Sequence, residues 1–240
     1  MQRSLRSLHP LVGTLFFVSV LVLSFSFVGK TVLHAAHPPF FTPLGSWSQY
    51  GFTAQYTSFN TMETTLSPTT ASHLTLAWKA PTNSTAQASQ PAVANGIIYS
   101  ASGSQVSAFQ TATGGLLWTA TIGGITNFIS PIVSHGIVYV CASSASAGLY
   151  ALDAQTGNML WHQSLGVVSN AYAAPTLANG VLYEGWDNGK FYAFDASTGK
   201  VLWSVPMYSL SASAGVANGM VYVSSDIHLY ALNAQDGKEV

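Results

Sequence analysis

Three observations predict an all-β fold, a partial β-propeller built of four-stranded antiparallel blades. Four segments repeat one pattern, and their turn glycines, Gly96, Gly136, Gly180 and Gly219, are spaced 40, 44 and 39 residues apart. Each repeat combines hairpin-turn residues with β-branched and aromatic runs, which suit strands. After the N-terminal apolar run no segment shows a sustained 3.6-residue apolar period, so we expect no helix there. Four short strands per unit of about 40 residues are typical of a propeller blade.

The first half of each repeat predicts a β-hairpin. In the first repeat, a short apolar segment reaches Asn95-Gly96, and both residue types tolerate the positive φ of a two-residue type I′ turn. Ile97, Ile98 and Tyr99 follow and form a second strand. The second half of the repeat predicts a third strand, a Thr-Gly turn and a fourth strand that ends in tryptophan.

The end of each repeat follows the pattern A-x-D-x-x-T-G-x-x-x-W. Two repeats match it at every position, with Ala151, Asp153, Thr156, Gly157 and Trp161 and with Ala193, Asp195, Thr198, Gly199 and Trp203. Gln110 in the first repeat and Asn233 in the fourth replace the acid. The pattern resembles the tryptophan-docking repeat of quinoprotein propellers, the PQQ-like repeat family. The resemblance implies that Gly permits a tight turn, that Asp and Thr bond to it, and that Trp packs on the neighbouring blade.

Three parts are expected along the chain. Residues 1–36 are a signal peptide or signal anchor, residues 37–90 are a lead-in segment, and residues 91–240 hold the PQQ-like repeats. The blades are expected at about 91–126, 130–166, 174–207 and 213–240.

The lead-in segment is similar to that of family members at Trp47, Asn60 and Glu63. Trp78 precedes Trp118 by 40 residues, one repeat period. We therefore expect residues 74–78 to be the closing strand of an incomplete blade.

The repeat period also bears on the end of the chain. It places the next tryptophan just beyond Val240, the last residue. Propellers typically need 4–8 blades to close, and the resemblance implies rings of seven or eight. The sequence is therefore interpreted as a C-terminally truncated fragment that carries about four blades.

Composition excludes several classes of protein. Charged residues make up 6% of the chain and hydrophobic residues 48%, so neither a charged helix bundle nor a disordered chain is expected. From His37 onward four lysines stand against eight acids, which is no basis for binding nucleic acid. The single cysteine, Cys141, excludes an intramolecular disulfide and is expected to be a small buried thiol.

The N-terminus predicts export. Arg3 and Arg6 precede an uncharged apolar run, residues 11–28, of 18 residues. A cleavable signal has about 7–15 apolar residues and a spanning helix about 17–25, so a cleaved signal and an apolar membrane anchor remain alternatives. In both cases the residues after Lys30 lie outside the cytoplasm, at the cell surface or in the extracellular space.

Glu184 is the candidate cofactor contact. The equivalent residues in the other repeats, Ser100, Val140 and Val223, carry no charge. A carboxylate beside Trp186 near the propeller axis would line a pocket; the alternative is a solvent-facing residue of an alternating strand.

No catalytic or metal-binding residue is assigned from the sequence. Asp153, Asp195 and Asp236 belong to repeat turns, where Asp bonds to its own backbone. The histidines outside the export segment show no metal-ligand spacing; they are His73, His135, His162 and His228.

Two functions follow from the resemblance. The first is an exported, non-catalytic binding or scaffold module whose partner is a protein or glycan at the cell surface. The alternative is the N-terminal part of a secreted PQQ-dependent alcohol or sugar dehydrogenase, which the lead-in segment favours. It implies PQQ and calcium, and in many such enzymes a disulfide between adjacent cysteines, for which Cys141 has no neighbour. The sequence therefore favours the non-enzymatic role.

Overall fold

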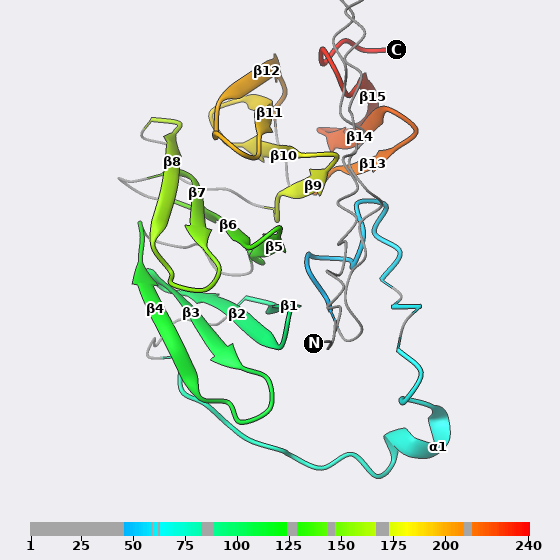
Figure 1. The fold of residues 1–240 in the computed structure, drawn as a ribbon. Coiled ribbons are helices and arrows are strands. Elements are labelled where there is room, and N and C mark those ends of the chain that lie inside the picture. The colour runs from blue at the N-terminus through cyan, green and yellow to red at the C-terminus, as the bar shows by residue number, and fades with distance from the viewer. Residues whose placement is uncertain are drawn as a thin grey trace, which may run out of the picture. The chain divides into compact units, whose positions relative to one another are not determined.

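Fifteen strands form four antiparallel sheets in the part of the chain that the structure describes (Figure 1). The structure is a computed structural model, and it describes residues 46–58, 60–61, 63–82, 89–123, 129–143, 147–166, 173–208 and 213–240. All of these belong to one unit, Phe41–Val240. The apolar run of residues 11–28, with its expected N-terminal helix, lies outside the described residues.

Each sheet is one blade, and its strands pair in chain order. Blade 1 consists of β1 (Ala92–Ala94), β2 (Ile97–Ser102), β3 (Gln105–Gln110) and β4 (Leu116–Thr121). Blade 2 consists of β5 (Ile132–Ser134), β6 (Ile137–Ala142), β7 (Gly148–Asp153) and β8 (Met159–Ser164). Blade 3 consists of β9 (Thr176–Ala178), β10 (Val181–Trp186), β11 (Lys190–Asp195) and β12 (Val201–Pro206). Blade 4 has β13 (Gly215–Ala217), β14 (Met220–Ser225) and β15 (His228–Asn233). The predicted fold class is confirmed.

The first hairpin of each blade has the predicted turn. In blade 1, Asn95 has a φ of 51° and Gly96 a φ of 75°, and Ala94 pairs with Ile97 across the turn. Two consecutive positive φ values define a type I′ turn, whose twist matches that of the flanking strands. His135 takes the place of Asn in blade 2 with a φ of 50°. The turn therefore depends on its backbone conformation more than on the asparagine side chain.

The repeat tryptophans join successive blades, as the family resemblance implied. The ring of Trp118 in blade 1 lies against Gly157 in blade 2, and its indole N–H donates to the carbonyl of Ala154 at 3.0 Å. The turn beneath it is held by Asp153, whose carboxylate accepts the N–H of Thr156 at 2.8 Å and its hydroxyl at 2.9 Å. The acid and threonine of the motif therefore shape the turn on which the preceding blade's tryptophan packs.

The contribution of the Trp118 hydrogen bond to stability can be measured by comparison with Trp161. Trp161 packs in the same way on Gly199, but its buried indole N–H has no acceptor among the described residues. We expect Trp118→Phe to lower the free energy of unfolding by about 1 kcal/mol more than Trp161→Phe, because only the first loses a hydrogen bond. Urea unfolding of both variants tests this, since the loss of ring volume is the same in each. Equal losses would contradict the difference between the two sites.

The hydrophobic core lies between blades, and each junction has its own cluster. Val138 and Val140 of β6 pack towards blade 1, whereas Tyr139 and Cys141 pack towards blade 3. A third cluster joins blades 3 and 4 around Val221 and its neighbours. The central strands of blades 2 and 3 are therefore buried on both faces, because a neighbouring blade covers each one.

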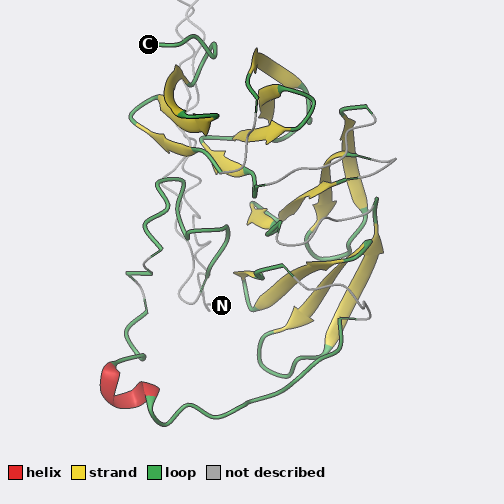
Figure 2. Ribbon diagram, turned by 180° about the vertical axis from the view of Figure 1, so that it is seen from behind, coloured by secondary structure: helices red, strands yellow, loops and turns green. Residues whose placement is uncertain are grey.

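The lead-in segment departs from the expectation in two ways (Figure 2). It contains one helical turn, α1 (Pro68–Ala71), where no helix was expected. Ser67 caps this turn, since its hydroxyl accepts the N–H of Thr70 at 3.2 Å, and Pro68 supplies the fixed φ of a helix start. These local signals suffice for a single turn without any apolar period.

The second departure concerns residues 74–78, which form no strand. Trp78 nevertheless docks like the repeat tryptophans. Its ring lies against Gly114, and its indole N–H donates to the carbonyl of Thr111 at 2.8 Å. The 40-residue spacing to Trp118 thus reflects the docking position and not a paired strand.

Among the described residues, no helix is long and apolar enough to cross a membrane.

Candidate functional site

Glu184, the sequence candidate, is buried in β10. Its exposed fraction is 2%, and neither oxygen of its carboxyl group has a hydrogen-bond partner. The solvent-facing alternative is therefore wrong, because strand alternation exposes one face only when no neighbour covers it, and blades 2 and 4 cover both faces of β10. Buried polar groups in proteins are nearly always paired, so an unpaired carboxyl marks a site that requires an explanation.

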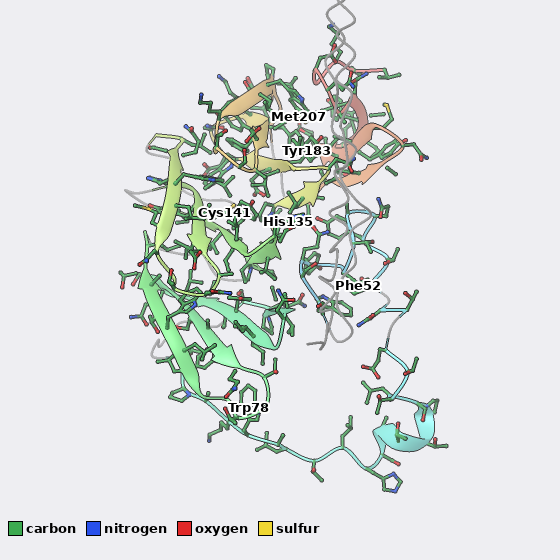
Figure 3. All side chains as sticks on the ribbon, in the orientation of Figure 1. Phe52, Trp78, His135, Cys141, Tyr183 and Met207 are labelled. Atoms are coloured by element: carbon green, nitrogen blue, oxygen red, sulfur yellow. The ribbon has the colours of Figure 1, made fainter. Side chains whose placement is uncertain are left out.

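The carboxyl of Glu184 faces the junction between blades 2 and 3. It shares a face of β10 with Leu182 and Trp186, both of which belong to the cluster at that junction. Tyr192 of β11 is its cross-strand partner. The charge of Glu184 also acts on Cys141 of β6, labelled in Figure 3. The surroundings of the carboxyl are therefore mainly apolar and aromatic, and in the part of the chain that the structure describes only burial shifts its pKa.

These apolar surroundings shift the pKa of Glu184 and of Cys141. Burial raises the pKa of Glu184 well above its ordinary value, because the charged form loses its hydration without gaining a partner. Burial, and secondarily the nearby Glu184, raise the pKa of Cys141 in the same direction. Burial thus favours the neutral form of both groups, and Cys141 is the small buried thiol that the sequence predicted.

A second element of the site comes from the lead-in segment. Residues 46–58, here called the strap, reach the innermost strand of every blade. Trp47 exchanges two backbone hydrogen bonds with Val93 of β1, at 2.7 and 2.8 Å. The carbonyl of Ser48 accepts the N–H of Val133 in β5 at 2.7 Å, and the side chain of Gln49 accepts the N–H of Leu177 in β9 at 3.3 Å.

The strap ends on blade 4 and comes close to Glu184. The carbonyl of Ala54 accepts the N–H of Val216 in β13 at 2.9 Å. The hydroxyl of Tyr56 bonds to that of Thr176, which in turn donates to the carbonyl of Ala214 at 2.7 Å. Burial raises the pKa of Tyr56, and Glu184 adds to this effect. Tyr56 thus lies near the buried carboxyl. Its bond to Thr176 is part of a chain of hydrogen bonds from the strap through β9 to Ala214, the residue before β13.

The remaining candidates from the sequence lie elsewhere. Asp195 accepts hydrogen bonds from Ser197 and Thr198 in its turn, and Asp236 forms an exposed ion pair with Lys238 at 2.7 Å. Glu63 is exposed and accepts the N–H groups of Thr65 and Leu66. These acids serve local backbone geometry. None of them is brought to Glu184.

The described histidines and acids do not form a complete metal site either. His162 stacks on Tyr150 with ring centroids 4.0 Å apart, and burial lowers its pKa. Across the described ranges, no three His, Cys, Asp or Glu side chains gather as metal ligands. Calcium takes six to eight oxygen ligands, commonly with several carboxylates. The described residues therefore offer Glu184 as one possible cofactor contact but not a full donor set for calcium.

The outer strands present a different feature, a repeated exposed apolar pair. Each pair precedes the docking tryptophan of its blade and is exposed by 42–61%. The three pairs, here called the rim pairs, are Leu116 and Leu117, Met159 and Leu160, and Val201 and Leu202. Trp118 packs on Gly157, two residues before Met159, and so connects one pair to the next.

Sequence reasoning missed the strap and the rim pairs. The strap was interpreted only as part of the lead-in segment, and its contacts with four separate strands leave no periodic pattern in the sequence. The rim pairs were visible as two apolar residues before each tryptophan, but their exposure follows from their place at the outer edge of the blade.

Solved structures resemble the fold at low identity. BamB from Moraxella catarrhalis matches at 19% identity with a TM-score of 0.53, covering 62% of this chain and 46% of that one. Quinohemoprotein alcohol dehydrogenase from Comamonas testosteroni matches at 21% identity with a TM-score of 0.70, covering 81% of this chain and 40% of that one. The computationally designed Ika4 protein matches at 15% identity with a TM-score of 0.52, covering 64% of this chain and 95% of that one.

These likenesses show the propeller fold, and the chain spans less than half the length of the two natural proteins. No curated protein sequence matches it. The model of the family described as outer membrane protein assembly factor BamB matches residues 75–171 and 145–240, which together are more than half of the chain. The chain therefore belongs to this family of PQQ-like repeat propellers.

Proposed function

We propose that this chain is an exported, non-catalytic binding module that uses the rim pairs to hold a protein partner at the cell surface. The observation that carries the proposal is the exposure of the same apolar pair on three successive blades. Exposed apolar side chains that repeat on one structural edge are typical of interaction surfaces. The apolar run of residues 11–28 after Arg3 and Arg6, from which we expect export, supports the location.

The chemistry of the rim pairs favours a protein over a glycan. All six side chains are aliphatic or thioether groups, which offer no hydrogen bonds to sugar hydroxyls. Partly buried tryptophans follow the pairs along each strand and enlarge the apolar area. Such a surface suits an apolar segment of another polypeptide, and the flexible Met159 side chain adapts to different shapes.

The binding test places a photo-crosslinking amino acid at Leu160, in a rim pair, of the exported chain. The matched control carries it at Leu76, an exposed leucine of the lead-in segment. We expect Leu160, but not Leu76, to crosslink to a defined cell-surface protein, and Leu117→Asn with Leu202→Asn to reduce that crosslink at least tenfold. Equal crosslinking from both positions would contradict the proposal.

The buried Glu184 favours a second candidate function, part of a PQQ-dependent dehydrogenase. In that case PQQ would supply the oxidising chemistry, and Glu184, with Tyr56 and Trp186 around it, would contact the cofactor. The quinohemoprotein alcohol dehydrogenase fold supports this candidate. The incomplete donor set for calcium among the described residues weighs against it.

Titration with PQQ and calcium separates the two functions. For a binding module we expect neither a change in the quinone absorbance at micromolar cofactor nor dye reduction with alcohols or sugars. Stoichiometric binding that Glu184→Ala abolishes, with turnover, would establish the dehydrogenase instead. Asp187→Ala, three residues away beyond the end of β10, is the control that should leave any binding unchanged.

A further inference from the structure

Four tryptophans each pack on the turn glycine of the repeat that follows, and one of them lacks a hydrogen bond that the other three make. The indole N–H groups of Trp78, Trp118 and Trp203 donate to backbone carbonyls at 2.8, 3.0 and 3.1 Å. Trp161 joins blade 2 to blade 3, and its buried N–H has no acceptor. The junction between blades 2 and 3 is thus the one of these four that lacks the bond.

A tyrosine repeats the same difference. The hydroxyl of Tyr99 donates to Ala154 across the blade 1–2 junction at 3.2 Å, and that of Tyr183 to Ala234 across the blade 3–4 junction at 3.4 Å. Tyr139 is the equivalent residue at the blade 2–3 junction. Its ring contacts Trp161, but in the described part of the chain its hydroxyl makes no such bond to the following blade. At each intact junction both donors share one acceptor, the carbonyl of Ala154 or of Ala234, and the blade 2–3 junction lacks both bonds.

Unpaired buried groups collect at this junction. The described residues contain six buried side-chain atoms without a partner, and four of them lie at this junction. These four belong to Trp161, Glu184 and Trp186, and the remaining two are in Gln105 and Ser130. Each unpaired buried group disfavours the closed state relative to a state in which water reaches it. Hydrogen bonding therefore stabilises the closed blade 2–3 junction less than it stabilises the two neighbouring junctions.

The strap holds the inner end of the junction. Ser48 bonds to β5 of blade 2, and the adjacent Gln49 bonds to β9 of blade 3. The two innermost strands are thus tied to neighbouring residues of one segment. The outer end, at Trp161, has only packing to hold it. Separation would begin at the outer end, with the strap as the hinge.

We propose that the junction between blades 2 and 3 is a seam that opens in the folded protein, by movement of two intact blades about the strap. Opening admits solvent to Cys141 and to the unpaired groups, while the blade 1–2 and blade 3–4 junctions stay closed. Strand pairing within each blade is complete, so no strand has to unfold. The seam is a conformational device of the fold and does not depend on the rim pairs.

Cys141 is a built-in reporter of this opening. It is the single cysteine of the chain, its exposed fraction is 0%, and it faces the seam. The test measures alkylation of Cys141 by iodoacetamide in the full chain, with each rate divided by the rate for the unfolded chain. The matched control is Ala101→Cys in a Cys141→Ala background, because Ala101 holds the equivalent buried position at the blade 1–2 junction.

We expect normalised alkylation of Cys141 to be at least tenfold faster than that of the control cysteine. Its rate should depend only weakly on sub-denaturing urea, because opening exposes little surface compared with global unfolding. Equal normalised rates at both positions would overturn the proposal. If the control variant does not fold, the native chain still decides the question, since a urea dependence equal to that of global unfolding would exclude a local opening.

Discussion

Replacing Gly157 with alanine is expected to lower the free energy of unfolding by about 3–5 kcal/mol. Gly157 has a φ of 75°, and a Cβ atom there would lie 2.6 Å from the ring of Trp118. Alanine would therefore combine backbone strain with displacement of the docked tryptophan. The strain comes from the positive φ of the turn, and the displacement comes from the ring that packs directly on the glycine.

The matched control for this prediction is Gly136→Ala in the same blade. Gly136 also has a φ of 75°, but a Cβ atom there would meet nothing within 4 Å. We expect only the backbone strain, about 1–2 kcal/mol. Urea unfolding of both variants measures the difference, and equal losses would show that the tryptophan gives way without cost.

Replacing Glu184 with glutamine is expected to stabilise the protein at neutral pH and to remove most of its pH dependence above pH 5. The pKa of Glu184 is raised in the folded state above its ordinary value of 4.5, so the folded protein retains a proton that the unfolded chain releases. The stability that comes with a neutral Glu184 is fully present below about pH 4.5 and is lost as pH rises towards the folded pKa. The slope is at most about 1.4 kcal/mol per pH unit.

Unfolding free energies from pH 4 to pH 9 test this prediction. Glu63→Gln is the control, since the pKa of the exposed Glu63 is lowered by the N–H groups of Leu66 and Thr65 and both states are ionised above pH 5. Its slope above pH 5 should equal that of the native chain. A Glu184→Gln slope that matches the native one would mean that the carboxyl is hydrated or paired in solution.

The local conformation of the repeats was determined by the sequence alone. Asn95-Gly96 defines its turn because few residues tolerate two positive φ values in succession. Asp153, Thr156 and Gly157 likewise form their turn from contacts within five residues. The repeat period of these signals predicted the blade. Trp78, one period before Trp118, was expected to end a strand; it docks like the repeat tryptophans although that strand does not exist.

Only the tertiary structure determined the environment of Glu184 and the path of the strap. Strand alternation leaves a residue such as Glu184 free to be exposed or buried, and the packing of blades 2 and 3 determines that it is buried. Gln49 and Leu177 bond across more than a hundred positions of sequence, and neither residue carries a local signal of the contact. Contacts within a turn follow from short-range sterics and hydrogen bonds, which a sequence displays directly. Contacts between blades depend on the assembled surfaces of distant segments, so they exist only once the fold has formed.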